Sequence, residues 1–207
     1  MKNENAIKSH IPKSALARLM SNEEVSREEL IELAKDENAD VRLSVAQNPK
    51  TPKEILEIFS KDEDYHVRIS VAENLSVPKE ILEILAKDKI WLVRKFVARN
   101  PETPKEILEL LVKDKDRYVR AFVAQNPNTP KEILEILAND KNLYVRASVA
   151  ENLKTPKESL EFLAKDEDSN VRIIIAQNPN TPKEILEILS KDEDPSVRAS
   201  ATKALKI

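Results

Sequence analysis

The sequence predicts an all-α solenoid of about seven 26-residue helix–turn–helix repeats that follow an N-terminal helical cap. The first observation behind this prediction is one 26-residue pattern that recurs without a gap from residue 51 to residue 206. The second is the helical spacing of the apolar residues within each repeat. The third is the absence of Gly from the chain, which disfavours dinucleotide folds, phosphate-cradling loops and hairpin-rich β architectures.

The period divides the chain into a cap and a repeat array. Segment 1–25 is the expected cap, because Ile11-Pro12-Lys13-Ser14-Ala15-Leu16 resembles the start of a repeat that lacks its second half. We expect residues 26–207 to form one continuous domain. Its repeats are 26–50, 51–76, 77–102, 103–128, 129–154, 155–180 and 181–206. In the last repeat Ala201-Thr202-Lys203-Ala204 replaces the usual Val-Ala-x-Asn, as is typical of a polar end.

The first helix of each repeat has its own start signal, which repeat 103–128 illustrates. Thr103 is placed to cap the helix, Pro104 suits the first helical position, and Glu106 lies three residues after the cap. An apolar stripe at helical spacing follows, and we expect it to face the core. Its members are Ile107, Leu108, Leu110 and Leu111.

A shorter second helix is expected from about Tyr118, with Val119, Val123 and Ala124 facing inward. It should end at Asn126, since a residue that precedes Pro is displaced from the α region. The sequence leaves open whether this eight-residue segment is α-helical or 3₁₀. Because the second helices carry Val and Ala where the first carry Ile and Leu, we expect their row to form the concave side.

The repeat pattern, with its Val-Arg, Asn-Pro and Pro-x-Glu-Ile-Leu signatures over residues 26–206, resembles the leucine-rich repeat variant family, a relative of HEAT-type solenoids. The resemblance implies a right-handed superhelix of alternating long and short helices. It implies little about function beyond the macromolecular binding that solenoids generally perform. Some relatives carry a Cys-ligated iron–sulfur module, which this chain cannot hold because it has no Cys.

Three polar residues recur once per repeat, and their regularity favours structural roles. The arginines are Arg42, Arg68, Arg94, Arg120, Arg146, Arg172 and Arg198. The aspartates are Asp36, Asp62, Asp88, Asp114, Asp140, Asp166 and Asp192. The asparagines are Asn48, Asn74, Asn100, Asn126, Asn152 and Asn178. We interpret the first two sets as a structural Arg–Asp ladder rather than a stripe for anionic ligands. The third should satisfy backbone groups where the second helix ends.

The composition favours a non-catalytic chain. The absence of Cys excludes disulfides, zinc–thiolate sites and Cys nucleophiles. His10 and His66 are the only histidines, and neither has a partner at metal-ligand spacing. We therefore expect no enzyme, cofactor, metal site or catalytic residue. With no signal peptide or apolar run of membrane-spanning length, we expect a cytoplasmic monomer that does not bind membranes.

Differences among the repeats concentrate on one face of the second helix. At the position of Tyr118 the other repeats carry His66, Leu92, Tyr144, Asn170 and Ser196. Four residues later, on the same face, they carry Ser70, Phe96, Phe122, Ser148, Ile174 and Ser200. The candidate partner-binding residues, which we call the aromatic strip, are Trp91, Leu92, Lys95, Phe96, Arg99, Arg117, Tyr118, Phe122, Leu143 and Tyr144. The strip is either a binding surface or interlayer packing by larger residues.

Charge favours the middle repeats as the working surface. Residues 77–128 hold 11 Lys/Arg and 8 Asp/Glu, a balance of +3 that leaves −6 for the rest of the chain. The leading interpretation is therefore a scaffold that binds a protein or peptide, such as an acidic peptide, along the strip. Nucleic-acid binding is the alternative, although such surfaces are usually more basic. An engineered or consensus-like array without a natural ligand is the third, yet repeats 51–76 and 103–128 agree at only 15 of 26 positions.

Overall fold

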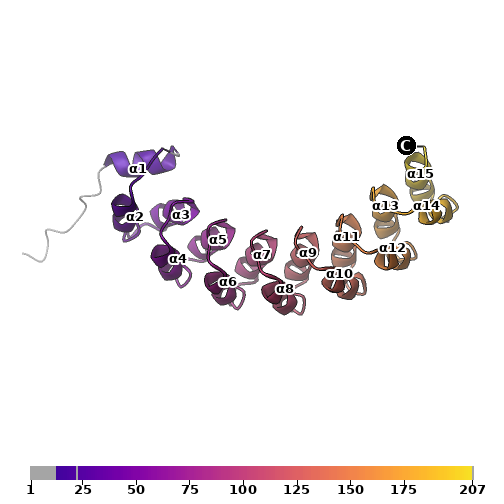
Figure 1. Cartoon of the computed structure of the whole chain (residues 1–207), viewed down its shortest axis with the longest axis horizontal. Helices are drawn as coiled ribbons and strands as arrows, with labels where there is room; N and C mark the ends of the chain where they lie inside the picture. Colours follow the sequence, from indigo (N-terminus) through magenta and orange to yellow (C-terminus); the bar gives the residue numbers. More distant parts are fainter. Residues whose placement is uncertain (1–12, 22, 207) are drawn as a thin grey trace, which may run out of the picture. The chain divides into compact units, whose positions relative to one another are not determined.

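The computed structural model describes residues 13–21 and 23–206, and within them it contains fifteen helices and no strand. The helices follow one another as two per repeat, which confirms the predicted all-α repeat architecture (Figure 1). None of the helices in these ranges has the length and apolar character needed to cross a membrane. The chain forms two compact units, Met1–Leu85 and Ala86–Ile207, and each is described by itself.

Within residues 13–21 and 23–85, the first unit contains one cap helix and five repeat helices. They are α1 (Lys13–Met20), α2 (Arg27–Leu33), α3 (Ala39–Gln47), α4 (Lys53–Phe59), α5 (Tyr65–Glu73) and α6 (Lys79–Leu85). Helix α1 packs on α3. The rest of the expected cap, residues 1–12 and 22, lies outside the described residues. Ser26 starts α2 with a full capping box, in which its side chain accepts the N–H of Glu29 and the Glu29 side chain accepts the N–H of Ser26.

The second unit contains nine helices within residues 86–206. They are α7 (Trp91–Arg99), α8 (Lys105–Leu111), α9 (Arg117–Gln125), α10 (Lys131–Ala138), α11 (Leu143–Glu151), α12 (Lys157–Leu163), α13 (Ser169–Gln177), α14 (Lys183–Leu189) and α15 (Pro195–Ala204). Neighbouring second helices (α7, α9, α11, α13, α15) approach one another more closely than the first helices do. Their row therefore forms the inner side of this unit's curve, as the small Val and Ala side chains predict (Figure 1).

The predicted Thr cap is wrong. Pro104 occupies the N-cap of α8 without any side-chain hydrogen bond. The Thr103 hydroxyl instead donates to the carbonyl of Val97 in the preceding helix, at 2.6 Å. Thr103 is buried, and a buried hydroxyl needs a partner. The Thr therefore joins the end of one repeat to the start of the next.

The second helices are α-helices, and the expected order of long and short helices is wrong. In the second unit the first helices have seven or eight residues, and the second helices have nine or ten. The second helix begins early because Asp116 caps α9, its side chain accepting the N–H of Tyr118 at 2.8 Å. It ends at Asn126, whose ψ is 126°. Asn152 ends α11 in the same way although Leu153 follows it, so Pro is not required.

The core lies between the two helices of each repeat and between adjacent repeats. Ile107, Leu108 and Leu111 of α8 are buried, as are Val119, Val123 and Ala124 of α9. The predicted stripe is too wide by one position, because the Leu110 side chain is 47% exposed. Leu110 lies at the edge of the apolar arc, where the adjacent repeat does not cover it.

Arg–Asp pairs join neighbouring repeats within each unit, which confirms the structural interpretation of the ladder. Arg120 donates through Nε to Asp140 Oδ2 at 2.6 Å and through Nη2 to Asp140 Oδ1 at 3.0 Å. Its Nη1 donates to the carbonyl of Asp114 in its own turn at 2.8 Å. The same bidentate arrangement joins Arg42–Asp62 in the first unit and Arg94–Asp114, Arg146–Asp166 and Arg172–Asp192 in the second. One guanidinium thus fixes both its own turn and its neighbour's.

The asparagines form a second ladder, which also confirms the predicted role. Asn126 Nδ2 donates to the carbonyls of Ala98 and Asn100, both at 2.8 Å. Asn126 Oδ1 accepts the N–H of Asn128 at 2.8 Å. Asn152 and Asn178 repeat this geometry one and two repeats further along. The carbonyls belong to the preceding repeat, so the asparagines also hold the repeats together.

Arg120→Ala should lower the free energy of unfolding by about 3–5 kcal/mol, because it leaves the buried Asp140 carboxylate without its cation. Arg198 is the matched control, since it donates to the carbonyls of Asp192 and Glu193 but is exposed and bridges no carboxylate of a following repeat. Arg198→Ala should cost about 1 kcal/mol or less. Chemical denaturation checks both values, and equal losses for the two variants would contradict the ladder.

The Arg–Asp ladder should also weaken in acid. Burial raises the pKa of Asp140, but the hydrogen bond from Arg120, the Asn142 N–H and nearby positive charge together lower that pKa by more. Its ionised form therefore stabilises the fold above the unfolded pKa of about 3.9, and the contribution is lost as pH falls through the lower folded value. Asp140→Asn should melt below the parent at pH 7, with the difference shrinking below about pH 4. A difference that stays constant down to pH 2.5 would refute this.

Candidate binding surface

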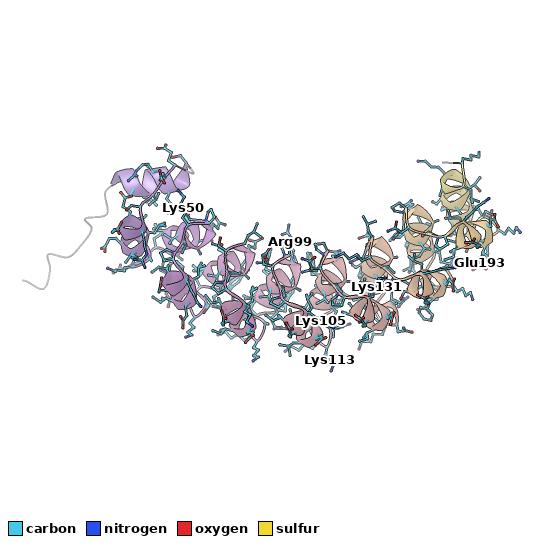
Figure 2. All side chains as sticks on the ribbon, viewed as in Figure 1. Lys50, Arg99, Lys105, Lys113, Lys131 and Glu193 are labelled. Carbon is cyan, nitrogen blue, oxygen red and sulfur yellow. The ribbon has the colours of Figure 1, made fainter. Side chains whose placement is uncertain are left out.

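The aromatic strip lies on three consecutive second helices, α7, α9 and α11, within the second unit. Trp91, Tyr118 and Tyr144 are 38%, 42% and 54% exposed. Each is the first or the second residue of its helix. Leu92, Lys95, Phe96, Phe122 and Leu143 are half-buried, and Arg99 and Arg117 are exposed. Arg99 extends from the row of second helices, whereas Lys113 extends from the row of first helices (Figure 2). The strip and the first helices thus present separate surfaces.

One ring cluster forms at the N-terminal ends of these helices. The Trp91 and Tyr118 rings lie 5.4 Å apart at an interplanar angle of 31°. The Arg117 guanidinium lies 4.9 Å from the Tyr118 ring centroid and 5.5 Å from that of Tyr144. Arg117 also donates to the Tyr118 hydroxyl at 3.2 Å, a hydrogen bond that raises the pKa of Arg117. One cation therefore connects rings from two repeats.

A second cluster follows one turn further along α7 and α9. Lys95 Nζ lies 5.0 Å from the Phe96 ring centroid and 4.4 Å from the Phe122 ring centroid. The Arg99 guanidinium lies 5.8 Å from the Phe96 ring. Lys95, like Arg117, contacts one ring of its own helix and one ring of the next second helix. These are cation–π contacts, in which a cation is attracted to the negative face of an aromatic ring.

The structure brings eight of the ten predicted residues into these two clusters. Leu92 and Leu143 are the other two, and their half-buried side chains fit interlayer packing as well as they fit binding. Trp91 is the first residue of α7. Its ring contact is with Tyr118 of the following repeat.

Two cations of the clusters, Lys95 and Arg117, form no ion pair within the described residues. Helices α7 and α9 contain no Asp or Glu. Arg94 and Arg120 of the same helices are paired with ladder aspartates. Lys95 and Arg117, in contrast, form no ion pair with any carboxylate of the described residues. The surface therefore combines apolar ring area with two cations that are held over rings and not in ion pairs.

Another row of exposed apolar side chains was missed by the sequence reasoning. Leu110, Ile136, Phe162 and Ile188, one from each first helix of repeats 103–206, are 47–62% exposed. The signal was present in the sequence, because each of these residues comes directly after the second Glu of the Lys-Glu-x-Leu-Glu motif. Their neighbours pair among themselves, as Lys105 does with Glu109 at 3.5 Å and Lys157 with Glu161 at 3.6 Å. Lys131 of α10 forms no such pair within the described residues, so the row differs from the strip in having no cation held over a ring.

The described residues contain no set of three His, Cys, Asp or Glu side chains arranged to hold a metal ion. The hollow in the first unit between Arg18, Glu24, Arg27 and Lys50 is lined by charges that pair with one another. Neither observation identifies a second candidate site of comparable chemistry to the strip.

Stacked helix pairs joined by polar ladders define the class of α-helical repeat scaffolds. Residues 91–116 and 117–142 each match the family profile described as leucine rich repeat variant. A solved structure described as a leucine-rich repeat variant with a novel repetitive structural motif is 31% identical, with 92% of this chain and 80% of that chain covered and a TM-score of 0.68. The chain belongs to the leucine-rich repeat variant family.

The chain is also similar, at lower identity, to engineered proteins of known structure. Two crystal structures of engineered proteins are 19% and 17% identical, over 86% and 88% of this chain and 94% and 98% of theirs. Their TM-scores of 0.37 and 0.38 are too low for the arrangements of helices to be compared. No curated protein matches the sequence.

Tyr118→Asn tests whether the strip is a surface or a packing element, since Asn170 already occupies the equivalent position. For a surface residue we expect a loss of about 1.5 kcal/mol or less in the free energy of unfolding. Leu111→Ala, which empties a core position, should cost about 2–5 kcal/mol. Denaturant titrations of both variants decide, and a Tyr118→Asn loss as large as that of Leu111→Ala would favour interlayer packing.

Proposed function

We propose that this chain is a non-catalytic scaffold that binds an acidic peptide segment of a protein partner along the aromatic strip. The observation that carries the proposal is the state of Lys95 and Arg117. Each cation is held against two rings and lacks a carboxylate partner. A partner that supplies carboxylates would give both cations the ion pairs that they lack within the described residues.

The contacts support a preorganised surface. A cation over a ring is stabilised by about 0.5–1 kcal/mol at an exposed site, which is enough to favour one position of a long side chain. Its remaining N–H groups stay available, since an ammonium has three donors and a guanidinium has five. Because the rings reduce the side-chain freedom that binding would otherwise remove, less conformational entropy is lost when a carboxylate docks.

The apolar part of the surface supports a partner that also brings apolar side chains. Trp91, Tyr118 and Tyr144 expose ring area beside the cations, and such aromatic residues and Arg are enriched among the residues that dominate binding energy. An extended nucleic-acid strand fits the strip less well, because the strip offers few cations to its regularly spaced phosphates. An acidic peptide with alternating apolar residues fits both features.

Trp91 is the only Trp of the chain and lies in the strip, so its fluorescence reports directly on binding. As probe we choose acetyl-(Glu-Leu)₄-amide, with acetyl-(Gln-Leu)₄-amide as the uncharged control. The Glu peptide should bind the parent chain and lose at least about tenfold in affinity, or 1.4 kcal/mol, in Lys95→Glu/Arg117→Glu.

The matched control is Lys113→Glu/Lys131→Glu, which makes the same charge change at two exposed positions outside the second helices, in the turn after α8 and at the start of α10. This variant should bind within about twofold of the parent at 150 mM salt, because its charges lie outside the strip. Equal losses in both variants, or equal binding of the Gln peptide, would refute the proposal. Tighter binding of a single-stranded oligonucleotide, with a steep salt dependence, would favour the nucleic-acid alternative instead.

A further inference from the structure

The Asn ladder is interrupted in the last repeat. Asn126, Asn152 and Asn178 each donate Nδ2 to two carbonyls of the preceding repeat, at 2.6–3.4 Å. The equivalent position of repeat 181–206 is Ala204, whose methyl group cannot donate. The two carbonyls that an Asn there would bond are those of Ala176 and Asn178.

The Ala176 carbonyl has no donor within the described residues. Its own helix supplies none, because Pro179 has no N–H and the N–H of Asn180 donates to Asn178 Oδ1 at 2.9 Å. The Asn178 carbonyl accepts only the N–H of Thr181, at 3.0 Å, where the corresponding Asn152 carbonyl also accepts Asn178 Nδ2. A carbonyl oxygen has two lone pairs, so both groups retain acceptor capacity.

A hollow of about 530 Å³ opens over these groups. Its lining includes Ala176, Asn178 and Thr181, Leu186 of α14, and Lys203 and Ala204 of α15. The volume is that of a small-ligand pocket, so the hollow admits more than a water molecule. Helix α15 also runs one residue further than the other second helices, through Ala204, because no Asn ends it there.

We propose that this hollow is a binding site for a primary carboxamide, presented by an Asn side chain of a partner peptide. The chain itself supplies the precedent, since its own Asn side chains occupy the equivalent position in the preceding repeats of this unit. Two N–H donors match the two carbonyl acceptors, whereas a carboxylate would place negative charge against them. In the ladder, the Asn Oδ1 accepts the backbone N–H of the residue two positions later. In the complex, the partner peptide would supply that N–H itself, by forming the same turn around its Asn. The site shares no residue with the aromatic strip.

The first test places a carboxamide in the hollow by a substitution in the chain itself. In Ala204→Asn the new side chain should donate to Ala176 and Asn178, as Asn152 does in a segment where Leu153 follows, just as Leu205 follows residue 204. Burial of these hydrogen bonds should raise Tm by about 2–4 °C in a thermal melt. An unchanged or lower Tm would contradict the claim that the hollow fits a carboxamide.

The second test uses the full chain and a peptide probe. Acetyl-Val-Ala-Glu-Asn-Leu-Lys-N-methylamide reproduces residues 149–154 and carries no other primary amide. The control replaces its Asn with Asp. With ¹⁵N-labelled chain, the Asn peptide should cause saturable amide shifts at Thr181 and Ser200, with a Kd on the order of 1 mM. Ala204→Asn should abolish these shifts.

The outcomes separate cleanly. Saturable shifts with the Asn peptide alone, lost in Ala204→Asn, support the site. Equal shifts with the Asp peptide, shifts that persist in Ala204→Asn, or no saturable shifts at all would overturn it. The Asp control uses the parent chain, so the test does not depend on the stability of the variant.

Discussion

The buried Arg–Asp bridge is the interaction on which the arrangement of the repeats depends. One repeat of two short helices cannot bury its own apolar face, so stability comes from stacking against neighbours. Apolar contact alone is non-directional and would allow adjacent repeats to slide. The Arg120 guanidinium removes that freedom, because it makes four hydrogen bonds in one geometry, two to the Asp140 carboxylate and two to the carbonyls of its own turn. The Thr and Asn contacts fix the same junction from the other end of the second helix.

Sequence reasoning predicted the period, the all-α class and both ladders, because each rests on residues that recur at fixed spacing. It failed where a residue had two locally plausible partners. Thr103 is a good N-cap residue in isolation, yet burial against the preceding helix gives its hydroxyl the Val97 carbonyl instead. Leu110 fits a helical stripe, yet the arc that a neighbouring repeat covers is narrower than the apolar arc of the helix. The length of the second helix depended on Asp116, which the sequence could equally place in a turn.

The sequence also predicted only part of the candidate binding surface. Variation among repeats located the aromatic strip, but spacing does not reveal which way a long side chain points. Only the structure shows that Lys95 and Arg117 each lie over two rings, and that the ladder neutralises Arg94 and Arg120 but not these two cations. The hollow beside Ala204 was likewise apparent only in the structure, because it depends on how the neighbouring helices pack. The first-helix apolar row did have a signal in the sequence, the position directly after the second Glu of its motif. Departures from the repeat, rather than the repeat itself, therefore identify the surfaces that can recognise a partner.

The most direct test of this separation replaces four strip residues with residues that other repeats already carry there: Trp91→Ser, Phe96→Ser, Tyr118→Asn and Phe122→Ser. Isothermal titration calorimetry of this variant with acetyl-(Glu-Leu)₄-amide, on protein whose cooperative melt has been verified, is the decisive measurement. We expect a folded chain that no longer binds the peptide. Peptide binding as tight as that of the parent, or a chain that no longer folds, would contradict it.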